Sequence, residues 1–176
     1  CRILAFIGAR GGAGSSTVAI NTAYCLSQNF SEEVVLLDLD LAFGTAALAL
    51  NMMPNQNIAE AMLQSGRLDE VMLERFLSHF DENLSVMAAP GYLDAGGQFD
   101  LGAFEALMDV VSRRAAFVVL DLPHQWAPWI NNILLGANEV VITATADLAS
   151  LKATKNLFDQ LSPKRGVDAP IRVVLN

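Results

Sequence analysis

The stretch GARGGAGSST at residues 8–17 decides how this 176-residue chain folds. It follows an apolar run at residues 3–7 and opens a helical pattern of apolar residues that begins at Val18. Strand, glycine-rich turn and helix in this order suit the phosphates of a nucleotide. Glycines let backbone N–H groups approach the phosphates, and the helix N-terminus adds a positive dipole. The stretch therefore predicts a phosphate-binding loop, since three glycines within four residues disfavour a plain tight turn.

One position in this loop departs from the usual pattern. A lysine commonly stands between the last glycine and the Ser or Thr that ligates magnesium. Here Ser15 takes the lysine position, Ser16 the magnesium position, and Thr17 is placed to reach another phosphate oxygen. Arg10 supplies the single cation of the loop, either as a planar fork on phosphate or as a solvent-facing side chain. We predict a nucleotide triphosphate site whose strongest point charge is replaced by a hydroxyl.

Length and composition favour a single domain over residues 1–176, and the phosphate loop predicts that this domain binds nucleotide. Apolar residues make up 53% of the chain, but no apolar run approaches the ~20 residues that span a bilayer. Short apolar runs are typical of strands buried on both faces of a parallel sheet. The net charge of −8 argues against direct binding of nucleic acid. Two cysteines are too few for a disulfide framework and fit a cytoplasmic protein.

Strand and helix patterns alternate along the chain. The predicted strands are Arg2–Ile7, Val34–Asp38, Leu84–Ala88, Phe117–Asp121, Glu139–Thr143 and Ile171–Asn176. The predicted helices are Ser16–Gln28, Asn57–Gln64, Leu68–His79, Leu101–Arg114, Trp126–Leu135 and Leu148–Leu161, and residues 91–99 form a predicted glycine-rich loop. This alternation predicts an α/β fold, a three-layer, doubly wound and mainly parallel sheet. Ligands of such sheets bind beyond the carboxyl ends of the strands.

Three aspartates fall at that edge of the predicted sheet. Asp38 and Asp121 each end an apolar strand, and Asp40 follows two residues after Asp38. A strand-end aspartate beside a phosphate loop is the expected partner of hydrated magnesium. Transfer of a phosphoryl group to water also needs an acid that orients the water, and Asp40 is our candidate. Taken singly, each aspartate could equally be a helix cap or a strand-end turn.

The chain resembles a known family of ATPases. Residues 10–17 (RGGAGSST) are similar to the deviant Walker A loop of the MinD/ParA family, Lys-Gly-Gly-x-Gly-Lys-Ser/Thr-Ser/Thr. Residues 34–44 (VVLLDLDLAFG) and 117–123 (FVVLDLP) resemble the family's switch I and Walker B segments. Within the family, residues 8–17 and 38–47 look like the ATPase domain of CpaE/TadZ, the localisation proteins of the Tad (Flp) pilus. The resemblance implies the P-loop NTPase topology and a domain excised from a longer chain with an N-terminal receiver-like domain.

The resemblance also implies roles for single residues. It places Arg10 at the lysine that reaches the partner subunit's phosphates, and Ser15 at the lysine that bridges the β- and γ-phosphates. The implied ATP-binding set is Arg10, Gly11, Gly12, Ala13, Gly14, Ser15, Ser16, Thr17 and Asn176, with Asn176 at the residue that reads the adenine edge. The implied magnesium ligands are Ser16, Asp38 and Asp121. Asp40, with Arg10, carries the implied catalytic role as the switch I aspartate linked to hydrolysis.

Both lysines of the family pattern are absent here, which removes contacts that stabilise the transition state. That loss slows hydrolysis by ~100-fold or more while leaving the glycine cradle and magnesium to hold ATP. We therefore expect an atypical ATPase with weak or absent hydrolysis. One interpretation is a homodimer joined through ATP that recruits pilus or secretion proteins to a cell pole or the inner-membrane pilus machinery. Membrane contact would be at most indirect. The alternative is an actively cycling MinD/ParA-type ATPase in spatial positioning.

Two tryptophans and a histidine follow Asp121 closely. Trp126 and Trp129 are three residues apart on a helical pattern, which predicts that they share a face. That face is either a core or dimer contact, or a partner-docking patch. His124 is either a turn residue or a group near the γ-phosphate.

Overall fold

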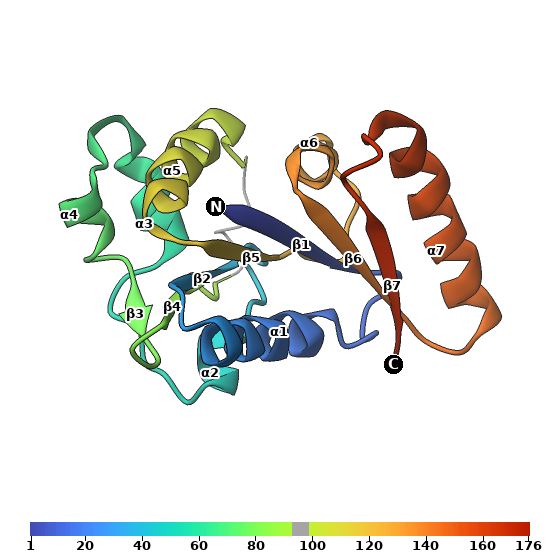
Figure 1. Cartoon of the computed structure of the whole chain (residues 1–176), viewed down its shortest axis with the longest axis horizontal. Coiled ribbons are helices and arrows are strands. Elements are labelled where there is room, and N and C mark those ends of the chain that lie inside the picture. The colour runs from blue at the N-terminus through green and yellow to red at the C-terminus, as the bar shows by residue number, and fades with distance from the viewer. Residues whose placement is uncertain (93–98) are drawn as a thin grey trace.

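The computed structural model describes residues 1–92 and 99–176. Its strands form one sheet of seven in the order β3-β4-β2-β5-β1-β6-β7 (Figure 1). The strands are β1 Arg2–Gly8, β2 Val34–Asp38, β3 Ser78–His79, β4 Leu84–Met87, β5 Phe117–Asp121, β6 Glu139–Ala144 and β7 Ile171–Leu175. All neighbouring strands are parallel except β3 and β4. The predicted doubly wound α/β sheet is confirmed, with one antiparallel edge strand that the sequence analysis did not include.

Helices cover both faces of this sheet and make it a three-layer structure (Figure 1). The helices are α1 Ser15–Phe30, α2 Ala46–Ala49, α3 Ile58–Leu63, α4 Glu70–Leu73, α5 Leu101–Arg114, α6 Pro128–Gly136 and α7 Leu148–Leu161, with 3-10 turns at Ser65–Arg67 and Ser162–Lys164. Within the described residues, none of these helices is long and apolar enough to cross a membrane.

The core is divided by the sheet into two clusters of buried side chains. Successive residues of β1 show the division, because side chains alternate between the faces of a strand. Phe6 packs in the cluster under α1 and α2. Ala5 and Ile7 pack in the cluster that includes residues of α3, α5 and α6. The central strands are therefore buried on both sides, which explains their nearly continuous apolar sequences.

The predicted helix Leu68–His79 is wrong over most of its length. Only Glu70–Leu73 is helical, and Ser78–His79 pairs antiparallel with β4. The carboxylate of Asp81 accepts hydrogen bonds from the N–H groups of Asn83 (2.9 Å) and Leu84 (2.7 Å) and so fixes a turn before β4. Sheet pairing and this turn override the helical spacing of the apolar residues, since propensity is only a weak prior.

Other boundaries differ by less. The structure adds α2, which the sequence analysis did not predict, and the helix predicted from Trp126 begins at Pro128, where proline favours the first helical position. Trp126 therefore precedes the helix and is exposed, while Trp129 stacks on Phe99 with ring centroids 4.0 Å apart. The predicted shared face of the two tryptophans is wrong. Most of the predicted loop at 91–99 lies outside the described residues.

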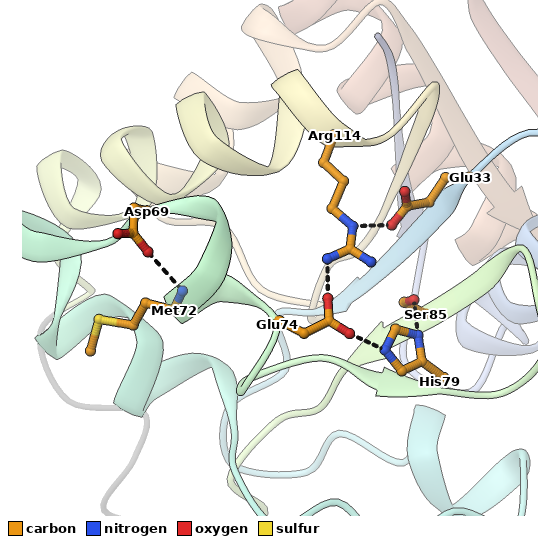
Figure 2. A network of polar contacts seen from close by, with 7 residues as sticks. All are labelled: Glu33, Asp69, Met72, Glu74, His79, Ser85 and Arg114. Carbon is orange, nitrogen blue, oxygen red and sulfur yellow. Dashed lines mark hydrogen bonds and ion pairs between the residues drawn. The ribbon is translucent and has the colours of Figure 1, made fainter.

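A polar network ties the β3–β4 side of the sheet to the end of α5 (Figure 2). The guanidinium of Arg114 donates hydrogen bonds to the carboxylates of Glu33 and Glu74. Glu74 also contacts the ring of His79, whose Nδ1 lies 2.8 Å from the Ser85 hydroxyl. The hydrogen bond from Arg114 holds the pKa of Glu74 below its ordinary value. This network helps to explain why residues 74–79 leave the helical path.

We expect Arg114→Met to lower the free energy of unfolding by about 1 kcal/mol, because the substitution keeps the apolar stem and removes two partly exposed ion pairs. Urea unfolding measures the change. The matched control is Arg113→Met, whose pair with Glu70 spans 3.9 Å between exposed side chains, and we expect a change below about 0.5 kcal/mol. Equal effects of the two substitutions would contradict the role of the network.

Candidate functional site

The glycine-rich loop joins β1 to α1 through two left-handed residues. Gly12 has φ 77° and Gly14 has φ 88°, conformations that favour glycine strongly. The loop is closed by a backbone hydrogen bond from Ala13 N to Arg10 O (3.3 Å), and α1 starts as Val18 N donates to Gly14 O (3.0 Å). The sequence thus folds locally as predicted, with its turn residues where the backbone needs them.

The N-terminus of α1 carries no side-chain cap. In contrast, α3, α4, α5 and α7 each begin at an Asn or Asp whose side chain accepts an N–H bond, at Asn57, Asp69, Asp100 and Asp147. The first N–H groups of any helix have no partner within the helix. In α1 they follow a left-handed glycine and no acidic residue stands in the first turn. This is the arrangement that binds an anion at a helix start.

Asn176 lies against the loop from the end of β7. Its Nδ2 donates a hydrogen bond to Ala13 O (3.1 Å), and its backbone N–H donates to Ala144 O (2.8 Å). A Cβ placed on Gly14 would lie 2.4 Å from the same Nδ2. Parallel pairing of β7 with β6 is what carries residue 176 to the loop. Asn176 therefore lies against the phosphate loop, and its role in reading the adenine edge stays a prediction.

Two buried polar atoms beside the loop have no hydrogen-bond partner among the described residues. They are Oγ of Ser15 and Oδ1 of Asp121. An unpaired buried polar atom is costly, so these atoms fit a site that contacts a bound polar group. Within residues 1–92 and 99–176, no group of three or more His, Cys, Asp or Glu could hold a metal by itself. A magnesium ion here would have to share its coordination with a nucleotide and water, which magnesium commonly does.

Asp38 and Asp121 are direct neighbours at the ends of β2 and β5. Both are almost completely buried, at 1% and 2% exposure. Burial raises the pKa of Asp121 to about 7, and the charge of Asp38 adds to the rise while the Ser16 hydroxyl opposes it. Burial likewise raises the pKa of Asp38 to about 6, against the hydrogen bonds from Ala46 and Asp40. The pair is therefore a carboxylate site that a cation would stabilise.

The two carboxylates nevertheless differ in their contacts. Asp38 Oδ1 accepts from Asp40 N (3.2 Å) and its Oδ2 accepts from Ala46 N (3.0 Å), so it holds the segment between β2 and α2. A Cβ on Gly44 would lie 2.4 Å from both Asp38 oxygens, so the sequence needs glycine there. Sequence reasoning missed Gly44, although its place four residues after Asp40 in the same segment was a usable signal.

Asp40 is partly exposed at the start of this segment. Its Oδ1 accepts a hydrogen bond from Phe43 N (3.2 Å), and its carbonyl accepts from Gly44 N (2.6 Å). The residue thus closes a turn with one carboxylate oxygen and leaves the side chain accessible. The turn interpretation is present in the structure, and it is compatible with the proposed catalytic one.

Arg10 contacts its own chain on the other side of the loop. Its Nη1 lies 3.2 Å from Oδ2 of Asp147, and both side chains are exposed. Asp147 caps α7 and accepts a hydrogen bond from the Thr145 hydroxyl (2.6 Å), which is the largest cause of its lowered pKa. Nothing in the sequence spacing pointed to Asp147. An exposed ion pair of this kind is weak, so Arg10 remains free to reach a phosphate.

His124 connects the segment after β5 to the start of the phosphate loop. Its Nδ1 donates to Gly8 O (3.0 Å), and its Cδ2 would lie 3.8 Å from a Cβ on Gly11. The structure therefore brings the loop, the three aspartates, Asn176 and His124 to the carboxyl edge of the sheet, as the fold class predicts.

A family model described as an AAA domain, AAA_31, matches residues 1–164. The chain belongs to this family. Its fold is also that of a ParA family ATPase from Chlorobium tepidum, with TM-score 0.90 and 24% identity over 99% of this chain and 73% of that one. A plasmid partition protein of Borrelia burgdorferi bound to AMPPNP has TM-score 0.75 and 21% identity, over 99% of this chain and 73% of its own.

A curated relative of this AAA domain is an uncharacterised ATP-binding protein of Methanocaldococcus jannaschii. It is 25% identical over 155 residues, which are 84% of this chain and 56% of that protein. The chain spans about half the length of the curated relatives it matches. The P-loop NTPase topology that the resemblance implied is thus confirmed.

The raised pKa values of Asp38 and Asp121 predict how the stability of the ligand-free protein depends on pH. The folded state binds more protons than the unfolded state between the ordinary aspartate pKa and about 7, so stability falls as pH rises through this window. From pH 6 to pH 8 we expect the free energy of unfolding to fall by about 2 kcal/mol. Urea unfolding at several pH values measures the slope.

The variant Asp121→Asn should flatten this slope, because its side chain does not titrate. Asp109→Asn, at an exposed position on α5, is the control and should leave the slope unchanged. A wild-type stability that rises between pH 6 and pH 8 would show that the buried carboxylates are not the groups that titrate.

Proposed function

We propose that this domain binds ATP with magnesium at the 11–17 loop and acts as a nucleotide-dependent dimerising switch with slow or absent hydrolysis. The observation that supports it most is the combination of an uncapped, left-handed start of α1 with the unpartnered Ser15 Oγ and Asp121 Oδ1 beside it. The nucleotide in the Borrelia burgdorferi relative, AMPPNP, is an ATP analogue and is consistent with this choice.

In this proposal the loop N–H groups and α1 hold the phosphates. Ser16 and Asp121 are the protein ligands of magnesium, which supplies charge that screens the phosphate oxygens. Asp38 is the third residue of the proposed magnesium shell; each of its oxygens accepts one backbone N–H, which fixes residues 40–46, and keeps a further lone pair. We assign the reading of the base to Asn176, whose side chain contacts the loop at Ala13.

The proposed hydrolysis is slow because no lysine reaches the transferring phosphate. Ser15 offers a short neutral hydroxyl at that position, and a preorganised charged contact of this kind is commonly worth a few kcal/mol in the transition state. Arg10, once released from Asp147, is the remaining cation of the loop and could reach phosphate in its own or a second subunit. Asp40 is the group available to orient a water molecule.

The biological role we propose is localisation or assembly of a Tad/Flp-type pilus machine, by recruitment of secretion proteins to a cell pole or the inner membrane. Its support is the resemblance of residues 8–17 and 38–47 to CpaE/TadZ. The longer curated relatives leave room for a further domain, such as a receiver-like one. The net charge of −8 is consistent with protein partners rather than direct contact with nucleic acid.

The test uses ATP labelled on the γ-phosphate, mixed with excess protein and magnesium. Protein-bound label and free phosphate are followed in time, and light scattering reports the oligomeric state. We expect label that stays bound and intact on a dimer. Steady release of phosphate that Asp40→Ala abolishes would instead favour a cycling ATPase. Absence of bound label would refute ATP binding. Asp109→Asn, at an exposed position on α5, is the control for the folding and handling of the variant protein.

A further inference from the structure

A cavity of about 440 Å³ lies beside the phosphate loop, on the side of α7. Three segments form its walls: the end of β1 with Gly8, the stretch after β5 with His124 and Trp126, and one stripe of α7. The α7 residues in the wall stand at positions 153, 156, 157 and 160, a spacing that puts them on one face of a helix. Its volume is in the range of sites for small organic ligands.

The chemistry of the lining is specific. Among the described residues around it there is no Lys, Arg, Asp or Glu. Three carboxamides, those of Gln125, Asn156 and Gln160, line it together with the indole of Trp126. Each carboxamide carries a donor and an acceptor side by side, which suits the edge of a nitrogen heterocycle. An aromatic side chain offers the flat surface on which such a ring stacks.

The two tryptophans of the chain differ in this respect. Trp129 already stacks on Phe99 and packs against the core. Trp126 is 54% exposed at the cavity and belongs to no aromatic pair among the described residues. A large exposed indole costs free energy that a stacked ligand would recover.

We propose that this cavity binds an uncharged nitrogen heterocycle of the nucleobase or nucleoside class, with Trp126 as the stacking surface and the carboxamides of Gln125, Asn156 and Gln160 on the edge of the ring. The site is distinct from residues 10–17, because none of them lines the cavity, whereas Gly8 and Ala9 at the start of the loop do.

The cavity is also connected to the phosphate loop. His124 lines it and donates to Gly8 O, and Gly8 and Ala9 are themselves part of the wall. A ligand that fixes His124 therefore restrains the strand end that leads into the loop. This coupling, which rests on the proposed function, makes the cavity a regulatory site for nucleotide binding. Each ligand should change the affinity for the other by the same factor.

The experiment uses the Trp129→Phe variant, in which Trp126 is the single indole and phenylalanine keeps the contact with Phe99. Adenosine, guanosine, cytidine and uridine are each titrated while indole emission is recorded, with and without saturating ATP and magnesium. We expect at least one nucleoside to give a saturable change in indole emission. The direction of this change should be the same with and without ATP. Ala153→Phe fills the cavity and should abolish the emission change. Ala149→Phe, at an exposed position on the same helix, should leave the emission change intact.

Gln160→Leu should weaken binding of the responding nucleoside about tenfold, as expected for loss of an edge-reading pair. The proposal fails if none of the four nucleosides gives a saturable change. It also fails if Ala153→Phe leaves the change intact, or if ATP competes it away, which would place the nucleoside at the phosphate loop.

The coupling is measured separately, as the affinity of a fluorescent ATP analogue with the nucleoside present and absent. A change of threefold or more in the affinity for the ATP analogue, about 0.7 kcal/mol, supports the coupling. An unchanged affinity refutes the coupling but not the binding site. If the analogue does not bind at all while Trp126 still responds to the nucleoside, the proposed function fails and the cavity site stands.

Discussion

Ser15→Lys is expected to raise the rate of ATP hydrolysis about 100-fold, the largest gain that we anticipate for any single substitution. The lysine returns a point charge to the position from which it can contact the transferring phosphate. Ser15 Oγ is buried and unpartnered, so the substitution breaks no hydrogen bond within the described residues. Release of labelled phosphate under single-turnover conditions measures the effect.

The matched control for this substitution is Ser15→Ala, which removes the hydroxyl without adding charge. We expect it to change the rate by less than about threefold, because a neutral hydroxyl stabilises little developing charge. In Ser15→Lys, the fold-increase in affinity for ATP should be smaller than the fold-increase in the hydrolysis rate, because the added charge acts mainly in the transition state. Equal gains in affinity and rate, or no gain at all, would contradict the explanation of slow turnover by Ser15.

Gly14→Ala is expected to weaken ATP binding about 100-fold, by two effects that add. Residue 14 has φ 88°, where an L-residue is strained by about 1–2 kcal/mol. The new Cβ would also lie 2.4 Å from Asn176 Nδ2, so that side chain must move and lose its bond to Ala13 O. Fluorescence titration with an ATP analogue measures the affinity.

Two variants separate the causes. Gly12→Ala has a similar strain at φ 77° but no atom within 4 Å of its Cβ, and we expect a loss of about tenfold. Asn176→Ala removes the displaced side chain, so its effect should not add fully to that of Gly14→Ala. Full additivity would show that Asn176 and Gly14 act independently, against the contact in the structure.

The positions of the aspartates could be predicted from the sequence, but their contacts could not. Asp38 and Asp121 each end an apolar run, and in a parallel sheet such ends meet at one edge, so their neighbourhood followed from the pattern. Their different contacts did not follow. Asp38 is held by the N–H groups of Asp40 and Ala46, a consequence of how the chain turns back after β2.

The two wrongly predicted helix boundaries have different physical causes. Residues 68–79 have helical spacing, yet pairing with β4, the Asp81 turn and the ion pairs of Arg114 decide otherwise. Of these contacts, only the ion pairs of Arg114 join residues distant in sequence. The β3–β4 pairing and the Asp81 turn are local, but the periodicity of apolar residues does not report them. At Trp126 the signal was local, because Pro128, two residues further on, favours the first position of a helix and marks the start of α6.

The sequence by itself determined the phosphate loop, the parallel α/β sheet and the position of the aspartates, because glycine conformation and apolar runs act locally along the chain. Only the tertiary structure decided which groups meet across the sheet. It placed Asn176 against Gly14, Asp147 against Arg10, and His124 beneath the loop and against the cavity of α7. The contacts that Asn176, Asp147 and His124 make with residues 8–14 each span more than 100 positions, and strand order, not local propensity, brings such residues together.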